Sequence, residues 1–141
     1  SPTMYPDFEN IMADGSPGKD LINDMRWVEN EFLPVVQQRG KAVIDSRGAS
    51  SATSAAKAAL DTVMACERPT LSGDCFSAAV ISDGSYDLPE GIICGMPLMT
   101  TPDGKVEIVR DITLSDLAKE KIKISTDELI EERSAVEDLL T

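Results

Sequence analysis

The chain has 141 residues, of which 42% are hydrophobic and 27% are charged, and this size and composition are typical of one globular domain. Its formal net charge of −12 argues against binding to nucleic acid or to an anionic membrane, because both depend on Lys and Arg. It contains no histidine, which excludes His-based acid–base catalysis and most His-ligated metal sites within these residues.

No apolar run approaches the roughly 20 residues of a membrane span, and the first six residues do not form a signal peptide. The chain begins with Ser1 rather than Met, which indicates either processing of the chain or further residues upstream. The cysteines are Cys66, Cys75 and Cys94, an odd number without a C-x-x-C pair. They indicate a reducing compartment, and each is expected to be a small buried apolar residue.

Residues 1–19 contain three prolines and are predicted to be irregular. A helix is predicted from Asp20 to Ser46, with a kink or break near Leu33 because Pro34 follows it. Its apolar face is predicted to carry Leu21, Met25, Val28, Phe32 and Val36.

Residues 50–65 are rich in Ser and Ala and predict a second helix, because alanine is the best helix former. Ser50 or Ser51 is its expected N-cap. Glycine in the Arg47-Gly48 pair interrupts the regular pattern between the two helices.

The middle of the chain predicts a small antiparallel sheet. Phe76 to Ile81 is short and apolar, as in a buried strand. Gly91 to Met99 is predicted as a second strand, which Pro97 should place at an edge or a bulge. The turn Pro102-Asp103-Gly104 predicts a hairpin to a third strand from Val106 to Val109.

The last part of the chain is predicted to be helical. One helical face is expected to carry Leu114, Leu117, Ala118 and Ile122. Ser125-Thr126-Asp127-Glu128 resembles a capping box that would start a further helix. That helix would carry the apolar and basic positions Leu129, Arg133, Val136 and Leu140. Together the predicted elements indicate an α+β fold in which helices pack on a small antiparallel sheet.

Two superficial motifs are better explained as turns. Asp83, Asp87 and Glu90 do not meet the spacing of a calcium-binding loop. Gly15 to Lys19 lacks the full spacing of a phosphate-binding loop, and Pro17 interrupts it.

A resemblance to a known family extends over nearly the whole chain, in a series of segments that follow the family's order. These are residues 1–7, Trp27 to Phe32, Val35 to Ile44, Arg47 to Ala52, Val80 to Tyr86, Pro89 to Gly91 and Glu131 to Val136. The chain resembles the carboxy-terminal, substrate-binding domain of malate dehydrogenases of the cytosolic type, within the lactate/malate dehydrogenase superfamily.

The resemblance implies half of a two-domain, dimeric cytoplasmic enzyme, with residues 1–141 forming the C-terminal domain. An upstream domain would bind NAD, and hydride would pass between the nicotinamide and C2 of malate or oxaloacetate, a step of the tricarboxylic acid cycle. The family's catalytic His–Asp pair and substrate-binding arginines would precede Ser1, so no catalytic residue is assigned within the chain. The isolated chain is expected to be inactive.

One part of the substrate pocket is implied within the chain. Gly48-Ala49-Ser50-Ser51-Ala52 matches the family's segment at the start of its Ala-rich helix, where a serine hydroxyl lies near the substrate carboxylate or the nicotinamide. Ser50 or Ser51 would therefore contact the substrate, and Gly48 would allow close backbone approach. Capping of the helix without substrate contact is the alternative.

Asp87 departs from the family, which commonly has glycine at this position. If the position requires a positive φ, Asp tolerates it less well than glycine does. Two alternative functions remain open at this stage: a non-catalytic interaction domain derived from the family, and part of a dehydrogenase for lactate or another 2-hydroxy acid.

Overall fold

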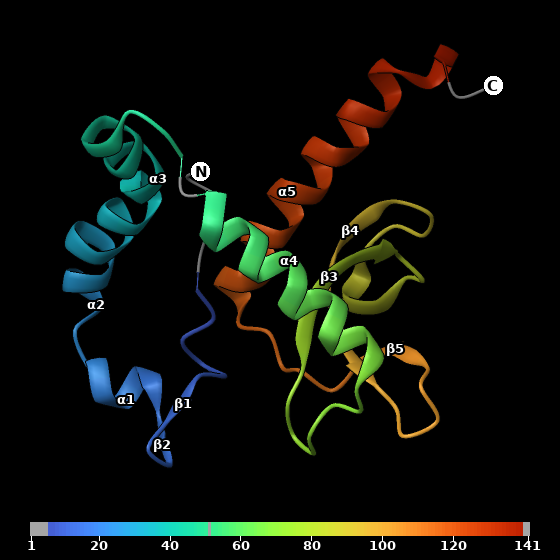
Figure 1. The fold of residues 1–141 in the computed structure, drawn as a ribbon, viewed down its shortest axis with the longest axis horizontal. Coiled ribbons are helices and arrows are strands. Elements are labelled where there is room, and N and C mark those ends of the chain that lie inside the picture. Colours follow the sequence, from blue (N-terminus) through green and yellow to red (C-terminus); the bar gives the residue numbers. More distant parts are fainter. Residues whose placement is uncertain (1–5, 51, 140–141) are drawn as a thin grey trace. The chain divides into compact units, whose positions relative to one another are not determined.

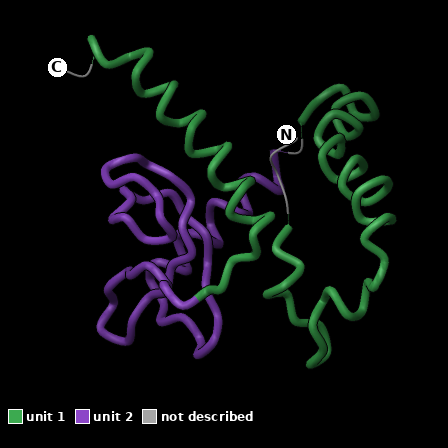
Figure 2. Tube along the Cα trace, turned by 180° about the vertical axis from the view of Figure 1, so that it is seen from behind, with its two compact units in different colours: residues 1–51, 112–141 green, residues 52–111 purple. Residues whose placement is uncertain are grey.

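The computed structural model describes residues 6–50 and 52–139, and it divides into two compact units. Unit 1 comprises residues 1–51 and 112–141, and unit 2 comprises residues 52–111 (Figure 2). The predicted segment 1–5, and the predicted positions Ser51 and Leu140, lie outside the described residues.

Unit 2 consists of a three-stranded antiparallel sheet, in the order β3-β4-β5, and the helix α4 (Figure 1). The strands are β3 (Phe76–Ile81), β4 (Ile93–Thr100) and β5 (Val106–Ile108), and α4 (Ala52–Glu67) packs against β3 and β4. The predicted helix over residues 50–65 and all three strands are therefore confirmed, with small shifts at their ends. The hairpin turn is also confirmed, because Gly104 has a φ of 82° and its N–H donates to the Thr101 carbonyl.

One face of this sheet forms the core of unit 2. Met96, Leu98 and Thr100 alternate along β4 with exposed fractions of 1%, 2% and 1%. The alternation follows from strand geometry, since successive side chains point to opposite faces. On the other face Ile81 and Ile93 are opposite each other and remain 67% and 65% exposed. The prediction that β3 is a buried strand is therefore wrong, since its residues alternate between half-buried and exposed.

The prediction that Pro97 marks an edge or a bulge is also wrong, because it lies in the central strand. The β4–β5 register places Val109 opposite Pro97, and the Val109 N–H donates to the Pro97 carbonyl at 2.9 Å. Residues in such an antiparallel pair exchange two hydrogen bonds, so a non-proline residue at position 97 would donate its own N–H to the Val109 carbonyl. That carbonyl instead accepts from the Tyr86 hydroxyl at 2.5 Å. The tyrosine thus supplies the donor that proline lacks.

A second proline of unit 2 is accommodated in the same way. The Ala65 carbonyl lies in the last turn of α4, where carbonyls lack a partner within the helix, and the residue four positions later, Pro69, has no N–H to donate. It accepts instead from the hydroxyl of buried Thr100 at 2.7 Å. Thr70 completes the arrangement: its N–H donates to the Thr100 carbonyl, and its hydroxyl accepts from the Thr100 N–H.

Unit 1 begins with a short hairpin and a series of helical segments where one long helix was predicted. The hairpin is β1 (Met12–Ala13) and β2 (Ser16–Pro17), so residues 1–19 are not wholly irregular. The helical segments are α1 (Gly18–Ile22), α2 (Met25–Trp27), the π-helical turn η1 (Val28–Phe32) and α3 (Leu33–Arg47).

The predicted Asp20–Ser46 helix is interrupted at Asn23 and Asp24. Asn23 ends α1 in the left-handed conformation with a φ of 41°, and Asp24 caps α2 by accepting from the Trp27 N–H at 3.0 Å. The break predicted near Leu33 is not found, because Phe32 and Leu33 keep right-handed helical angles; the helix instead changes pitch, from η1 to α3, immediately before Pro34. The predicted common face does not extend through α1, where Leu21 is 58% exposed, whereas Val28 is fully buried.

The capping box predicted at Ser125 is wrong, because α5 (Asp116–Ala135) is one continuous helix. Its N-cap is Ser115, whose hydroxyl oxygen accepts from the Ala118 N–H at 3.2 Å. The buried Thr126 hydroxyl donates back to the Ile122 carbonyl at 2.9 Å. The helix ends before Val136, and a short 3-10 turn follows over Glu137–Leu139.

The α+β prediction is confirmed. Among the described residues, no helix combines the length and apolar composition needed to cross a membrane. The three cysteines are free, and burial raises the pKa of the Cys94 thiol. Cys66 and Cys94 are only half-buried and Cys75 is exposed, so the prediction of three buried cysteines is wrong.

Candidate functional site

The segment predicted to contact substrate connects α3 to α4. Gly48 ends α3 with a φ of 70°, and its N–H donates to the Ile44 carbonyl at 2.8 Å. Glycine is favoured here because an L side chain is strained at this φ. A Cβ added at Gly48 would meet no described atom within 4 Å, so in the described residues the backbone angle, rather than close approach, is what requires glycine.

Ser50 is exposed and lies in irregular structure two positions before α4 begins at Ala52. Whether Ser50 or Ser51 caps α4 stays a prediction, since Ser51 lies outside the described residues. The sequence around the segment is electrostatically suited to an anion. Arg47 immediately precedes Gly48, and no acidic residue occurs in the first turn of α4. A helix N-terminus also carries partial positive charge from its unpaired N–H groups.

A turn in unit 2 contains the second group of polar residues that the sequence singled out. Asp87 has a φ of 60°, which confirms that a position usually occupied by glycine in the family takes the left-handed region here. Tyr86 has the same φ of 60°, and its hydroxyl bond to Val109 anchors the turn. Sequence reasoning did not identify this role, because no local pattern reveals a partner so far along the chain.

Asp83 and Arg110 form an exposed ion pair beside that turn. The Asp83 carboxylate also accepts from the Ser85 N–H at 3.0 Å, and the Arg110 Nε donates to the Ser85 hydroxyl at 3.1 Å. Hydrogen bonds from Ser85 and Arg110 lower the pKa of Asp83 to about 2. The pair therefore holds the turn in place, and nothing in its geometry indicates proton transfer near neutral pH.

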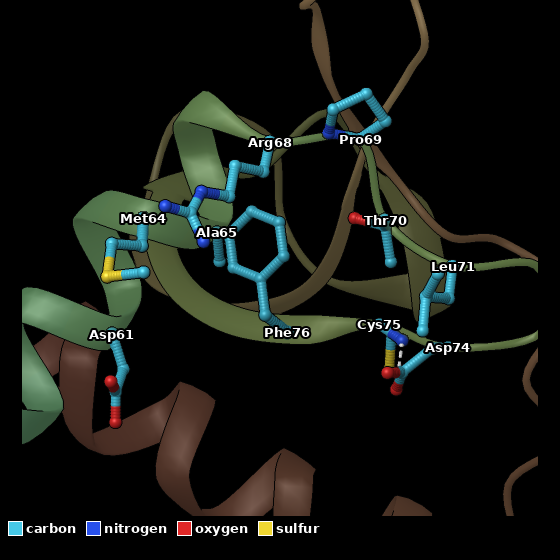
Figure 3. A pocket seen from close by; sticks show the side chains of 10 residues that line it. All are labelled: Asp61, Met64, Ala65, Arg68, Pro69, Thr70, Leu71, Asp74, Cys75 and Phe76. Atoms are coloured by element: carbon cyan, nitrogen blue, oxygen red, sulfur yellow. Dashed lines mark hydrogen bonds between the residues drawn. The ribbon is translucent and has the colours of Figure 1, made fainter.

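Each unit has an open pocket among its described residues. The pocket of unit 2, about 280 Å³, lies between the end of α4 and the start of β3 (Figure 3). Arg68 and Phe76 line it, and at one side the Asp74 carboxylate accepts from the Cys75 N–H at 2.8 Å. The pocket of unit 1, about 420 Å³, is lined by Phe8, Glu9, Lys19, Asp20, Asn23, Met25, Ser115 and Leu117. Neither pocket includes Gly48 or Ser50.

The described residues contain no group of three or more His, Cys, Asp or Glu side chains that could hold a metal ion. Asp83, Asp87 and Glu90 accordingly lie around the turn without forming such a group. The segment Gly15 to Lys19 forms the second half of the β1–β2 hairpin and the start of α1.

Residues 1–139 match the family described as lactate/malate dehydrogenase, alpha/beta C-terminal domain. A malate dehydrogenase of Magnetococcus marinus is 48% identical over 140 residues, which are 99% of this chain and 43% of that protein. Among solved structures, malate dehydrogenase from Naegleria fowleri matches with 40% identity and a TM-score of 0.83, over 99% of this chain and 42% of that one.

A more distant structure, lactate dehydrogenase of Trichomonas vaginalis in complex with NADH and oxamate, has 23% identity and a TM-score of 0.82. The match covers 98% of this chain and 43% of that one, and it supports the fold alone. The chain thus spans less than half the length of the relatives it matches. The family match and the identity together establish that this chain belongs to the lactate/malate dehydrogenase family and corresponds to its α/β C-terminal domain.

Proposed function

We propose that the chain is the substrate-binding part of an NAD-dependent malate dehydrogenase, a cytoplasmic dimer that interconverts malate and oxaloacetate. The observation that carries the proposal is the 48% identity to a malate dehydrogenase over 99% of the chain. The Trichomonas vaginalis lactate dehydrogenase structures match at 23% identity and give no comparable support for another 2-hydroxy acid.

In this proposal the chain binds and orients the substrate while a dinucleotide-binding domain holds NAD, whose nicotinamide supplies or accepts the hydride. The chain has no histidine, so in this proposal the proton exchanged with the substrate's C2 oxygen is handled by the family's His–Asp pair, outside these 141 residues. Ser50 or Ser51 would donate a hydrogen bond to a substrate carboxylate, next to the N–H groups that begin α4. Gly48 would end α3 so that the segment can reach the substrate.

The proposal is tested first with the chain alone, by measuring oxaloacetate-dependent oxidation of NADH. No turnover is expected. Turnover at ordinary enzyme rates, on the order of 1–1,000 per second, would contradict the proposal, because these residues contain none of the family's acid–base pair. The same chain is then fused to the amino-terminal part of the Magnetococcus marinus malate dehydrogenase, and the fusion is expected to oxidise NADH with oxaloacetate.

Variants of the fusion test the site residues. Ser50→Ala and Ser51→Ala are compared with Ser46→Ala, which removes an exposed hydroxyl from α3. Loss of a substrate hydrogen bond is expected to lower kcat/KM for oxaloacetate roughly tenfold in at least one of the first two variants. If both retain the kcat/KM of Ser46→Ala, the serines have no role in substrate binding.

A further inference from the structure

The chain contains three Asp–Gly peptide bonds, at Asp14-Gly15, Asp83-Gly84 and Asp103-Gly104. Such bonds are chemically labile, because glycine has no side chain to hinder attack of its backbone nitrogen on the preceding carboxyl carbon. The structure places the three in different environments. We propose that Asp14 is a site of spontaneous isoaspartate formation, and that the fold protects the other two.

The reaction needs no partner other than water. The Gly15 nitrogen forms a bond to Cγ of Asp14 and loses its proton, and one carboxyl oxygen leaves as water, which closes a five-membered succinimide. Water then adds to either carbonyl of the ring. Addition at one carbonyl restores aspartate, and addition at the other leaves the main chain running through Cβ and Cγ, with a free α-carboxylate. The isoaspartyl carboxylate is the group that an isoaspartyl methyltransferase would recognise.

At Asp83 both reacting groups are engaged. The carboxylate pairs with Arg110 and accepts from the Ser85 N–H at 3.0 Å. The Gly84 N–H donates to the hydroxyl oxygen of buried Ser82 at 3.3 Å. Cyclisation would have to break both sets of bonds. A carboxylate held in its ionised form is also a poorer electrophile than a neutral carboxyl group.

Asp103 is engaged in a similar way within the hairpin turn between β4 and β5. Its carboxylate accepts from the Thr101 hydroxyl at 2.6 Å and pairs with the Lys105 ammonium at 2.6 Å. The Gly104 N–H donates to the Thr101 carbonyl at 2.9 Å. The turn belongs to a three-stranded sheet, so opening it also costs ladder hydrogen bonds.

Asp14 lacks these restraints. Within residues 6–50 and 52–139, no hydrogen bond or ion pair holds its carboxylate. The β1–β2 ladder pairs Met12 with Pro17 and Ala13 with Ser16, so the Gly15 N–H lies outside it. Both turn residues are exposed, and Asp14 is held at a φ of 49° that an L residue adopts only at a cost. A hairpin of two-residue strands resists opening weakly.

The local sequence offers a matched comparison, because Asp14 and Asp83 are both followed by Gly-Ser. The purified 141-residue chain is incubated at neutral pH, and isoaspartate is located by peptide mapping and by methylation with an isoaspartyl methyltransferase. Asp14 is expected to isomerise at least about fivefold faster than Asp83 and Asp103, which corresponds to about 1 kcal/mol in activation free energy. In denaturant the three rates are expected to converge.

Two variants complete the test. Asp14→Glu keeps the charge but would require a less favourable six-membered ring, and it is expected to remove most of the methylatable isoaspartate. Asp103→Glu is the control and should leave the total nearly unchanged. Equal rates at the three positions in the folded chain would overturn the proposal. A rate of isoaspartate formation at Asp14 that stays higher than at Asp83 and Asp103 in denaturant would also overturn it, since the local sequence rather than the structure would then cause the difference.

Discussion

Unit 1 and unit 2 each contain prolines next to regular structure, and they accommodate them differently. In unit 2 the donors that Pro69 and Pro97 lack are replaced by the hydroxyls of Thr100 and Tyr86, whose acceptors lie 35 and 23 residues away in sequence. In unit 1, by contrast, the helical pitch changes immediately before Pro34, with the Leu33 N–H donating to the Val28 carbonyl. Unit 2 therefore depends on long-range bonds, whereas unit 1 adjusts locally.

Side chains on β4 of unit 2 are also more deeply buried than those on α3 of unit 1. Met96, Leu98 and Thr100 of unit 2 are at most 2% exposed. In unit 1, α3 contains no buried residue, and Val35 and Ile44 along it are 66% and 48% exposed. We infer that unit 2 contributes most of the folding stability of the chain. Truncating side chains of unit 1 should therefore lower the free energy of unfolding less, on average, than truncating side chains of unit 2.

The largest expected effect compares one apolar truncation in each unit. Leu98→Ala should lower the free energy of unfolding by about 2–5 kcal/mol, because it removes buried methyl groups and leaves a cavity. Val35→Ala should change it by less than about 0.5 kcal/mol, because the side chain is mostly exposed. Urea unfolding followed by circular dichroism measures both. A cost for Val35→Ala that rises with protein concentration would instead indicate burial of α3 between copies of the chain.

The next comparison makes one chemical change, Thr to Val, at a buried threonine of each unit. Thr100→Val removes the only donor described for the Ala65 carbonyl and should lower the free energy of unfolding by about 1–3 kcal/mol. Thr126→Val should cost about 0.5 kcal/mol or less, because the Ile122 carbonyl can keep its helical N–H partner from residue 126. Urea unfolding of the two variants is the measurement. Equal costs would show that the Thr100 bond does not compensate for Pro69.

A smaller effect is expected at Tyr86, which is half-buried, so that water can replace part of what is lost. Tyr86→Phe should cost about 1–1.5 kcal/mol by leaving the Val109 carbonyl without its donor. Pro97→Ala would restore an N–H at the position facing that carbonyl. A double-mutant cycle should therefore show that Pro97→Ala is more favourable in the Tyr86→Phe chain than in the original chain. Additive free energies would contradict the proposed compensation.

These long-range replacements explain where sequence reasoning succeeded and where it failed. The Pro102-Asp103-Gly104 turn and the strand Phe76–Ile81 were predictable, because turn chemistry and short apolar runs are local signals. The position of Pro97 in a central strand was not, because it depends on a hydroxyl that reaches Val109 from another segment. Proline propensity alone favours an edge.

The two serines in the C-terminal region illustrate a different difficulty. Ser125 precedes Glu128 with the spacing of a capping box, yet Ser115 is the N-cap and α5 continues through Ser125. Helix formers on both sides outweighed the local capping signal. For the candidate site, the sequence places Ser50 and Gly48 between two helices, and the structure confirms that placement. Substrate contact by Ser50 or Ser51 depends on the family resemblance and remains to be tested by the fusion variants.

The smallest expected effect is the pH dependence contributed by the exposed ion pair of unit 2. The pKa of Asp83 is lowered to about 2 in the folded chain, below its usual value near 4, because Ser85 and Arg110 stabilise the carboxylate. A depressed folded pKa contributes stability above the unfolded value and loses it as the pH falls through the folded value. Asp83→Asn should therefore be less stable than the original chain at neutral pH, and the difference should shrink between about pH 4 and pH 2.

Asp45→Asn in unit 1 is the matched control, since it removes one carboxylate from an exposed pair with Lys41 on α3. Among the described residues Asp45 accepts only from Lys41, without a further bond such as the one from Ser85 to Asp83. An exposed pair alone contributes little to the free energy of unfolding, so the stability of Asp45→Asn relative to the original chain should vary less over the same pH range. Unfolding by urea at a series of pH values measures both differences. If Asp45→Asn shows the larger acid-dependent convergence, the Asp83–Arg110–Ser85 arrangement adds nothing beyond an ordinary surface pair. The long-range restraints of unit 2 would then be confined to its hydroxyl–carbonyl bonds.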